Sequence, residues 1–279
     1  MTLVTPRTVL KGLVATGVGA ATGASAYGFL YARHQLGVTR ENIGVSGLPA
    51  ALDGLRIGML TDIHRSRWVS HEDVSDAVTM LMAERTDLII LGGDYVTLLD
   101  RQYVGPSADA LAPLTAPNGV FAILGNHDDD HEMPAALAKS GVPVLKDART
   151  HLTINGTGIE LAGIRYWTRR LSDIAAVTRG ATGPLILLAH DPRRLTEAAA
   201  LNIPLVLSGH THGGQVVLPG LGAIAAQKFP VIAGLGRLRR TAMFVSRGVG
   251  TVYVPVRINC PPEVAVLTLH PDTTSPAGL

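Results

Sequence analysis

The chain has 279 residues, of which 47% are hydrophobic and 16% charged, so it is long and apolar enough to fold around a core and is not a disordered protein. Its single cysteine, Cys260, excludes a disulfide framework, a cysteine-rich zinc module and an iron–sulfur cluster. The formal net charge of +2 gives no reason to expect nucleic-acid binding. A mean hydropathy of +0.27 is high for a soluble protein, so the distribution of the apolar residues along the chain matters.

Residues 1–40 have the pattern of a membrane-directing segment. Arg7 and Lys11 precede a run of uncharged residues that reaches to Arg33. A basic start, an apolar middle and small residues at positions 24–26 are typical of an export signal, whereas the length is close to the ~20 residues that span a bilayer. We expect a signal peptide or an N-terminal membrane anchor, and both alternatives stay open. The protein is then at the cell membrane or exported, with its catalytic domain on the outer side of the cytoplasmic membrane.

Five short apolar runs predict the strands of a buried sheet. Each run is too brief for a helix, and an uninterrupted apolar run of this length is typical of a strand that is covered on both faces. The runs are residues 55–60, 88–91, 120–124, 185–189 and 204–207.

Helical patterns lie between several of these runs. Ser70 and Asp73 form the start of a capped helix, and its apolar positions fall on one face: Val74, Ala77, Val78, Leu81 and Met82. Asp191 followed by Pro192 caps a helix over residues 193–201. A shorter helix is expected from Pro134 to Ser140. The alternation of strands and helices predicts an α/β domain.

Residues able to bind a metal ion follow every predicted strand. The candidates are Asp62, His64, Asp94, Asn126, His190, His210 and His212. Ligands bind at the carboxyl ends of strands in open α/β sheets, so these side chains should converge there. In Asp62-x-His64 and in His210-x-His212, an extended chain would point both residues to the same side. Seven oxygen and nitrogen ligands without sulfur are too many for one tetrahedral zinc, and they suit two divalent ions about 3.5–4 Å apart.

Together these motifs resemble those of the calcineurin-like metallophosphoesterases. The matching segments are Asp62-x-His64, Gly93-Asp94, Gly125-Asn126-His127-Asp128, His190 and Gly209-His210-x-His212. Residues 246–250 and 257–263 resemble the exported or membrane-associated bacterial branch of that family. The resemblance implies two β-sheets packed face to face between helices, which we expect over residues 41–270. Residues 271–279 are expected to form a loose tail.

The resemblance also implies roles for the candidate residues. Asp94 would bridge two divalent metal ions, which are Mn, Fe or Zn. Asp62, His64 and His212 would hold one ion, and the remaining three of the seven candidates would hold the other. His127 would face the substrate, where it would stabilise the phosphoryl oxygens or protonate the leaving oxygen, while a water activated by the metals attacks phosphorus.

One position departs from the family pattern. Many members carry an Asp three residues after the Gly-Asp aspartate, and in phosphomonoesterase branches it orients the catalytic His. Thr97 stands at that position here, which favours a diesterase over a monoesterase. Asp100 and Asp128 are candidates to orient His127 instead.

The substrate is expected to be a phosphodiester or pyrophosphate with a lipid part. Residues 220–238 follow the last candidate ligands, are apolar and suggest a lipid-facing lid. Lys228, Arg247 and Arg257 are candidates for a basic rim that attracts phosphate, whereas a solvated basic face is the better interpretation of Arg237, Arg239 and Arg240. The alternatives are a nucleotide phosphodiesterase or phosphomonoesterase and, outside enzymes, a membrane-tethered binding module stabilised by metal. The oligomeric state stays open.

Overall fold

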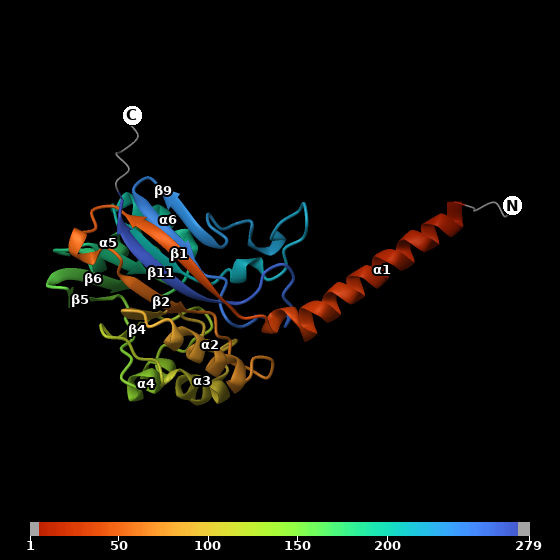
Figure 1. Ribbon diagram of the computed structural model, residues 1–279, viewed down its shortest axis with the longest axis horizontal. Coiled ribbons are helices and arrows are strands. Elements are labelled where there is room, and N and C mark those ends of the chain that lie inside the picture. The colour runs from red at the N-terminus through yellow and green to blue at the C-terminus, as the bar shows by residue number, and fades with distance from the viewer. Residues whose placement is uncertain (1–5, 273–279) are drawn as a thin grey trace.

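All five apolar runs form strands in the structure, a computed structural model that describes residues 6–272 (Figure 1). They are β2 (Arg56–Leu60), β3 (Leu88–Leu91), β4 (Val120–Ala122), β7 (Leu185–Leu188) and β8 (Leu205–Ser208). The predicted strands are therefore confirmed: β3 has the predicted bounds, and the ends of the other four differ by at most two residues.

Further strands complete two mixed sheets. They are β1 (Gly37–Val45), β5 (Ala148–Ile154), β6 (Thr157–Gly163), β9 (Gly234–Leu238), β10 (Thr241–Val245) and β11 (Glu263–Pro271). One sheet has the order β1-β11-β2-β3-β4 and the other has the order β5-β6-β7-β8-β10-β9. Strands β2, β3 and β4 are parallel, and so are β6, β7 and β8. The polar residues that follow them therefore meet at one edge of each sheet.

The two sheets pack face to face around a shared hydrophobic cluster. Ile57 and Met59 of β2 belong to this cluster together with Leu205 of β8. Because side chains alternate between the faces of a strand, Leu60 of β2 and Val206 of β8 belong to clusters on the outer faces instead. Each buried aliphatic side chain contributes about 1.5–3 kcal/mol of hydrophobic free energy, so a slip in strand register would be costly.

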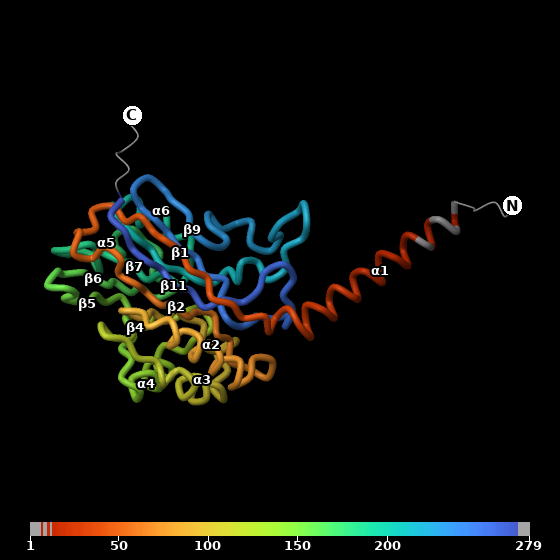
Figure 2. Tube along the Cα trace, viewed as in Figure 1, coloured from red at the N-terminus to blue at the C-terminus, as the bar shows by residue number. Residues whose placement is uncertain are grey.

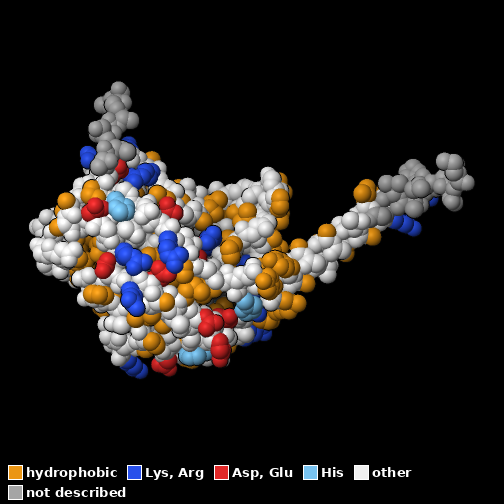
Figure 3. Space-filling model, viewed as in Figure 1, with side chains coloured by type: hydrophobic (Ala, Val, Ile, Leu, Met, Phe, Trp, Pro, Cys, Tyr) orange, Lys and Arg blue, Asp and Glu red, His pale blue; other side chains and the backbone are white. Residues whose placement is uncertain are grey.

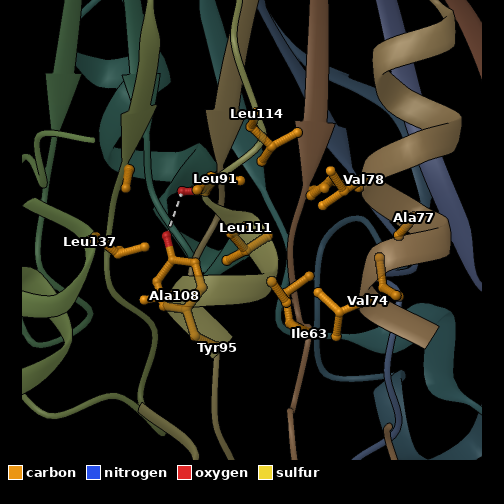
Figure 4. Close-up of a cluster of buried hydrophobic side chains, with 14 of the residues drawn as sticks. Ile63, Val74, Ala77, Val78, Leu91, Tyr95, Ala108, Leu111, Leu114 and Leu137 are labelled. Carbon is orange, nitrogen blue, oxygen red and sulfur yellow. Dashed lines mark hydrogen bonds between the residues drawn. The ribbon is translucent and has the colours of Figure 1, made fainter. Parts of the chain in front are cut away.

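Helices cover both outer faces, which confirms the predicted α/β sandwich. The helices over the first sheet are α2 (His71–Ala83), α3 (Val104–Leu111) and α4 (Glu132–Lys139). Figure 4 shows Val74 and Val78 of α2 beside Ile63, and Tyr95 donating a hydrogen bond to the carbonyl of Leu91. The second sheet is covered by α5 (Leu171–Thr178) and α6 (Leu195–Ala200).

The predicted helix starts are largely confirmed. Ser70 accepts a hydrogen bond from the Asp73 amide while the Asp73 carboxylate accepts one from the Ser70 amide, so α2 begins with the expected capping box. The side chain of Asp191 caps a short 3-10 turn over Pro192–Arg194, and α6 follows directly. The helix expected from Pro134 is α4, which begins two residues earlier.

The helix α1 (Pro6–Leu30) projects away from the sandwich, as Figures 1 and 2 show. The segment Leu13–His34, which is almost wholly exposed, is long and apolar enough to cross a membrane by length and composition. Strand β1 begins at Gly37, before the expected start of the catalytic region at residue 41. The tail expected at residues 271–279 lies almost wholly outside the described residues.

Candidate metal centre

The seven candidate ligands come from loops that directly follow five strands. Asp62 and His64 follow β2, Asp94 follows β3, Asn126 follows β4, His190 follows β7, and His210 and His212 follow β8. Among the described residues, three groups of side chains have ligand atoms within 4.8 Å of one another. The groups are Asp62 with His64 and His212, His64 with Asp94 and His127, and Asp94 with His190 and His210. Loops from both sheets thus contribute to one cluster.

Asp94 lies at the centre of this cluster. Its Oδ2 is 3.1 Å from Nε2 of His190 and 3.5 Å from Nε2 of His64. Nε2 of His212 is 3.3 Å from Oδ1 of Asp62, on the His64 side of the cluster. This arrangement places one carboxylate between two sets of nitrogen donors, as a bridged pair of ions requires.

Unpaired polar atoms in the cluster fit the presence of cations. Nε2 of His64, Nε2 of His190 and Oδ1 of Asn126 are buried without a hydrogen-bond partner. A buried polar atom left unpaired costs about 1–3 kcal/mol, which a metal ion would offset. Nδ1 of His190 lies 2.7 Å from the carbonyl oxygen of Gly92, to which it donates, and Nδ1 of His64 lies 3.1 Å from the hydroxyl of Thr97. These contacts leave each Nε2 free as a ligand.

The two buried carboxylates favour a positive charge between them. Burial raises the pKa of Asp62. Burial also opposes ionisation of Asp94, but His190 and His64 outweigh it and hold the pKa of Asp94 well below its usual range. For His190 burial is outweighed by the carboxylates of Asp94 and Asp62, which raise its pKa to about 10. Nitrogen and oxygen donors around two carboxylates suit divalent cations.

Extended strands do not align the candidate ligands, so that part of the sequence-based prediction is wrong. Asp62 and His64 have φ of 52° and 49°, and His210 and His212 have φ of 73° and 51°. Asp94 is also left-handed, with φ of 56°. The strands end before these residues, and left-handed turns direct the side chains inward. Such conformations cost of order 1–3 kcal/mol each for non-glycine residues and cluster at functional sites.

Two glycines make room for the carboxylates. A Cβ atom at Gly125 would collide with Oδ1 of Asp94, and one at Gly209 would collide with Oδ2 of Asp62. No residue with a side chain fits either position without displacing a candidate ligand. Glycine at these two positions therefore lets the backbone approach the carboxylates closely.

A backbone amide, rather than a carboxylate, orients His127. The N–H of Leu98 donates a 2.9 Å hydrogen bond to Nδ1 of His127, so the neutral ring carries its proton on Nε2. Burial lowers the pKa of His127. Thr97 contacts His64 instead, and the carboxylate of Asp100 accepts hydrogen bonds from Gln102.

Asp128 does not orient His127 either. Its carboxylate accepts hydrogen bonds from the backbone amides of Asp94, Tyr95 and Gly125, so it ties the loop after β3 to the loop after β4. Burial and the neighbouring Asp94 raise the pKa of Asp128 to about 7.

Comparison with known families decides what this cluster belongs to. The family model of the calcineurin-like phosphoesterases matches residues 55–214, which include all seven candidate ligands. The chain belongs to the calcineurin-like phosphoesterase family. It is therefore a hydrolase acting on phosphoester bonds, of a family that depends on two metal ions.

Individual relatives agree with this assignment. The chain is 31% identical over 278 residues to the uncharacterized metallophosphoesterase YkuE of Bacillus subtilis, covering 94% of this chain and 96% of that protein. It is 32% identical over 246 residues to the phosphodiesterase YaeI of Escherichia coli, covering 85% and 87%. It is also 32% identical over 265 residues to a transmembrane protein with a metallophosphoesterase domain from Danio rerio, covering 87% of this chain and 59% of that protein.

Aromatic side chains that the sequence analysis did not single out surround this metallophosphoesterase centre. The rings of Tyr166 and Phe229 each lie 5.3 Å from the ring of His210, and the ring of Tyr253 lies 5.7 Å from that of His127. Aromatic residues make up only 4% of the chain, and this rarity was the one feature of the sequence that could have marked these residues as candidates for the site. Of these three, Phe229 and Tyr253 line the cavity that leads to the centre.

A cavity of about 740 Å³ opens directly onto the centre. Its inner wall includes Asp94, Asn126 and His127. The remaining wall is mainly apolar and comes from α1, from the segment after β8 and from the segment before β11. These residues include Ser25, Val216, Leu218, Ile224, Phe229, Val254, Val256 and Ile258. Figure 3 shows hydrophobic side chains gathered where α1 meets the sandwich.

The expected basic rim is wrong for Arg257 and Arg247. Arg257 is fully buried, and its guanidinium donates hydrogen bonds to the carbonyls of neighbouring loop residues, including Gly250. Arg247 pairs with Glu263. Lys228 does line the cavity. The segment expected to form a lid contributes to the cavity wall up to Phe229 and then continues into β9.

Proposed function

We propose that this metallophosphoesterase hydrolyses a phosphodiester or pyrophosphate bond in a lipid-linked substrate at the outer face of the cytoplasmic membrane. The observation that carries the proposal is the mainly apolar cavity of about 740 Å³ that ends at the candidate metal centre. A cavity with apolar walls and a charged end suits an amphiphilic phosphoester, because the chain of the lipid is buried while its phosphoryl group meets the centre.

The candidate ligands form two sets, one for each metal ion. Asp62, His64 and His212 are proposed to hold one divalent ion, Mn, Fe or Zn. Asn126, His190 and His210 hold the second, and Asp94 lies between the two sets. When bound, the ions would neutralise phosphoryl charge and activate a water for attack on phosphorus.

His127 acts on the substrate rather than on the ions. The amide of Leu98 fixes its ring through Nδ1, so that the Nε2–H is free to donate a hydrogen bond to a phosphoryl oxygen. Its ring is 4.9 Å from the ring of His64, close to the candidate ligands. A donor held in place before the reaction stabilises developing charge without reorganisation.

A second cleft provides room for the other arm of a diester. It has a volume of about 520 Å³ and adjoins the cavity at Tyr253, which lines both. Arg67, Trp68, Gln102 and Tyr103 line this cleft. A polar group on one side of phosphorus and an apolar group on the other would fit the two openings. The same aromatic and basic lining favours a second candidate, hydrolysis of a nucleotide phosphodiester.

The outer-face location rests on the N-terminal segment. Arg7 and Lys11 precede the apolar part of α1, and basic residues flanking a span favour the cytoplasmic side. The sandwich, on the other end of the helix, is then outside. Similarity to a protein named as transmembrane supports a membrane location.

The activity is tested with bis-p-nitrophenyl phosphate and added Mn²⁺, alongside metal analysis of the purified protein. We expect turnover that Asn126→Ala abolishes while the fold, followed by circular dichroism, is retained. Folded, metal-loaded protein without turnover would refute the catalytic proposal. Rates on lipid-linked pyrophosphates in detergent, compared with rates on cyclic nucleotides, decide between the two substrate classes.

A further inference from the structure

Four exposed apolar side chains stand around the mouth of the cavity. They are Leu221, Ile224, Tyr253 and Val254, with exposed fractions of 63%, 54%, 71% and 58%, and we call them the apolar rim. Ile224, Tyr253 and Val254 also line the cavity itself. Single exposed apolar residues are ordinary, but a group of them around one opening marks a contact surface.

The end of α1 is seated against this opening. Ser25 lines the cavity, and the carbonyl of Gly28 accepts a 3.3 Å hydrogen bond from the amide of Arg257. A Cβ atom at Gly28 would lie 2.6 Å from Val256, so helix and cavity wall are in close contact. The ring of Phe29 packs edge-on against Trp68 at 5.7 Å. The helix and the cavity therefore share one wall.

The length of α1 sets the distance from the cavity to a membrane. Arg7 and Lys11 lie before the candidate span, which begins at Leu13, so the part of the span before Ser25, residues 13–24, is only about 18 Å long at the rise of ~1.5 Å per residue. The hydrocarbon core of a bilayer is about 30 Å thick. A helix that crosses this core consequently has no free turns left to hold the sandwich away from the membrane. The apolar rim then lies at the membrane surface.

Aromatic and basic residues near the end of α1 are a separate indication that the membrane surface lies at the height of the apolar rim. Tyr27 on the last turn of α1 and Tyr31 directly after the helix are exposed, with ring centroids 5.4 Å apart. The guanidinium of Arg33 donates to the carbonyl of Trp68, and that of Arg67 lies over the Trp68 ring at 4.6 Å. Tyr and Trp are enriched at the boundary between hydrocarbon and water, and Arg interacts there with lipid phosphates.

We propose that the apolar rim rests in the headgroup region of the bilayer that α1 enters, so that the cavity opens at the membrane interface. An amphiphilic phosphoester then moves from the bilayer into the cavity without its chain crossing water. The substrate part of this inference rests on the proposed function, whereas the docking of the rim does not. The occupant of the rim is a phospholipid surface.

The docking is tested with the full chain in vesicles of phosphatidylcholine and phosphatidylglycerol. Leu221→Cys and Val254→Cys are each labelled with an environment-sensitive fluorophore, and some lipids carry a nitroxide quencher near the headgroup. Leu171→Cys is the matched control, because Leu171 is also exposed and begins α5, a helix at the opposite side of the sandwich from α1 (Figure 1). The unaltered chain controls for background labelling, since its Cys260 is buried.

We expect blue-shifted emission and at least about two-fold quenching at positions 221 and 254, and neither at position 171. Quenching at 221 and 254 that equals that at 171 overturns the docking. A blue shift without quenching by lipid also overturns it, because a second copy of the chain would then cover the rim.

A second measurement separates this inference from the proposed function. Leu221→Asp should lower hydrolysis of a lipid-linked pyrophosphate in vesicles about five-fold or more relative to Leu171→Asp, since a charge at this level weakens interfacial contact. Hydrolysis of soluble bis-p-nitrophenyl phosphate should not change, because Leu221 lies outside the cavity lining. Equal rates of the two variants on the lipid substrate contradict lateral entry. Absence of activity on both substrates in every variant contradicts the proposed function and leaves the fluorescence result standing.

Discussion

His127 is oriented by a main-chain group in a position where many members of the family use a carboxylate. The amide of Leu98 holds its Nδ1, while the hydroxyl of Thr97 holds Nδ1 of His64. Leu98 has φ of 53°, a left-handed conformation that turns its amide toward the ring. An amide fixes the ring without adding the negative charge of a carboxylate. Two neighbouring residues of one loop thus position a candidate ligand and a candidate substrate-contacting group.

The role of His127 leads to a prediction for its variants. His127→Ala should lower kcat about 10²–10³-fold, because a preorganised donor to the phosphoryl group is lost. Metal content should stay at the level of the unaltered protein, since the proposed ligands are intact. His127→Gln, which keeps an amide donor, should recover part of the rate. An unchanged kcat in His127→Ala, measured on bis-p-nitrophenyl phosphate, would show that the ring does not act in the reaction.

The glycines beside the carboxylates give a second prediction at this scale. Gly125→Ala should weaken metal binding about 10–100-fold, because the added Cβ displaces Oδ1 of Asp94. Gly105→Ala is the matched control, since nothing lies within 4 Å of a Cβ there and the position is helical. The control should bind metal like the unaltered protein, because Gly105 is exposed and lies away from the candidate ligands. Calorimetric titration with Mn²⁺ measures the first effect, and equal affinities in both variants would contradict it.

At the scale of elements, short parallel strands set the positions of the candidate ligands. β2, β3 and β4 end side by side, and β7 and β8 do the same in the other sheet. The cluster between the sheets includes Ile57 and Leu207 and holds the two edges in register. Helices such as α2 cover the outer faces and contribute no candidate ligand. The apolar side chains of the strands therefore stabilise the fold, whereas the loops that follow the same strands provide the candidate ligands.

This separation predicts a change in stability without a change in activity. Ser70→Ala removes the side-chain cap of α2 and should lower the unfolding free energy by about 1 kcal/mol. The corresponding fall in Tm is about 2–4 °C for a domain of this size. Thr79→Ala, on an exposed position of the same helix, should have an effect below about 0.5 kcal/mol. A loss of kcat in Ser70→Ala under folded conditions would show that α2 is coupled to the site.

The whole molecule brings together two functions that lie in different parts of the chain. The sandwich gathers loops from both sheets around Asp62 and Asp94, and the N-terminal helix ends against the cavity that leads to them. The net charge of +2 includes Arg7 and Lys11, without which basic and acidic residues balance. Substrate attraction by overall charge is accordingly small, and location at the membrane would supply local concentration instead.

Metal removal tests the centre as a property of the whole fold. A chelator should abolish turnover and lower Tm by about 5 °C or more, because ions bound to the native state alone stabilise it and their loss leaves two carboxylates buried together. Added Mn²⁺ should restore both quantities. Differential scanning calorimetry with and without chelator measures the effect, and a Tm that does not respond to chelator or metal would argue against bound ions.

Local patterns in the sequence determined the five strands that precede the candidate ligands, the capped helix α2 and the identity of the polar residues at those strand ends. Apolar runs and caps act over a few residues, so they can be recognised without knowing the partner segment. The parallel pairing of β1 with β11, from opposite ends of the chain, has no such local signal. Burial of Arg257 among loop carbonyls and the Leu98–His127 contact likewise depend on segments that meet only after folding.

Tertiary structure alone decided how the centre is built and approached. The sequence predicted seven converging side chains, but left-handed turns rather than extended strands direct them, because the strands end before the ligands begin. The cavity is assembled from α1, the segment after β8 and the segment before β11, which are distant in the chain. A site's residue types can be recognised from short-range patterns, whereas its shape and surroundings depend on long-range packing.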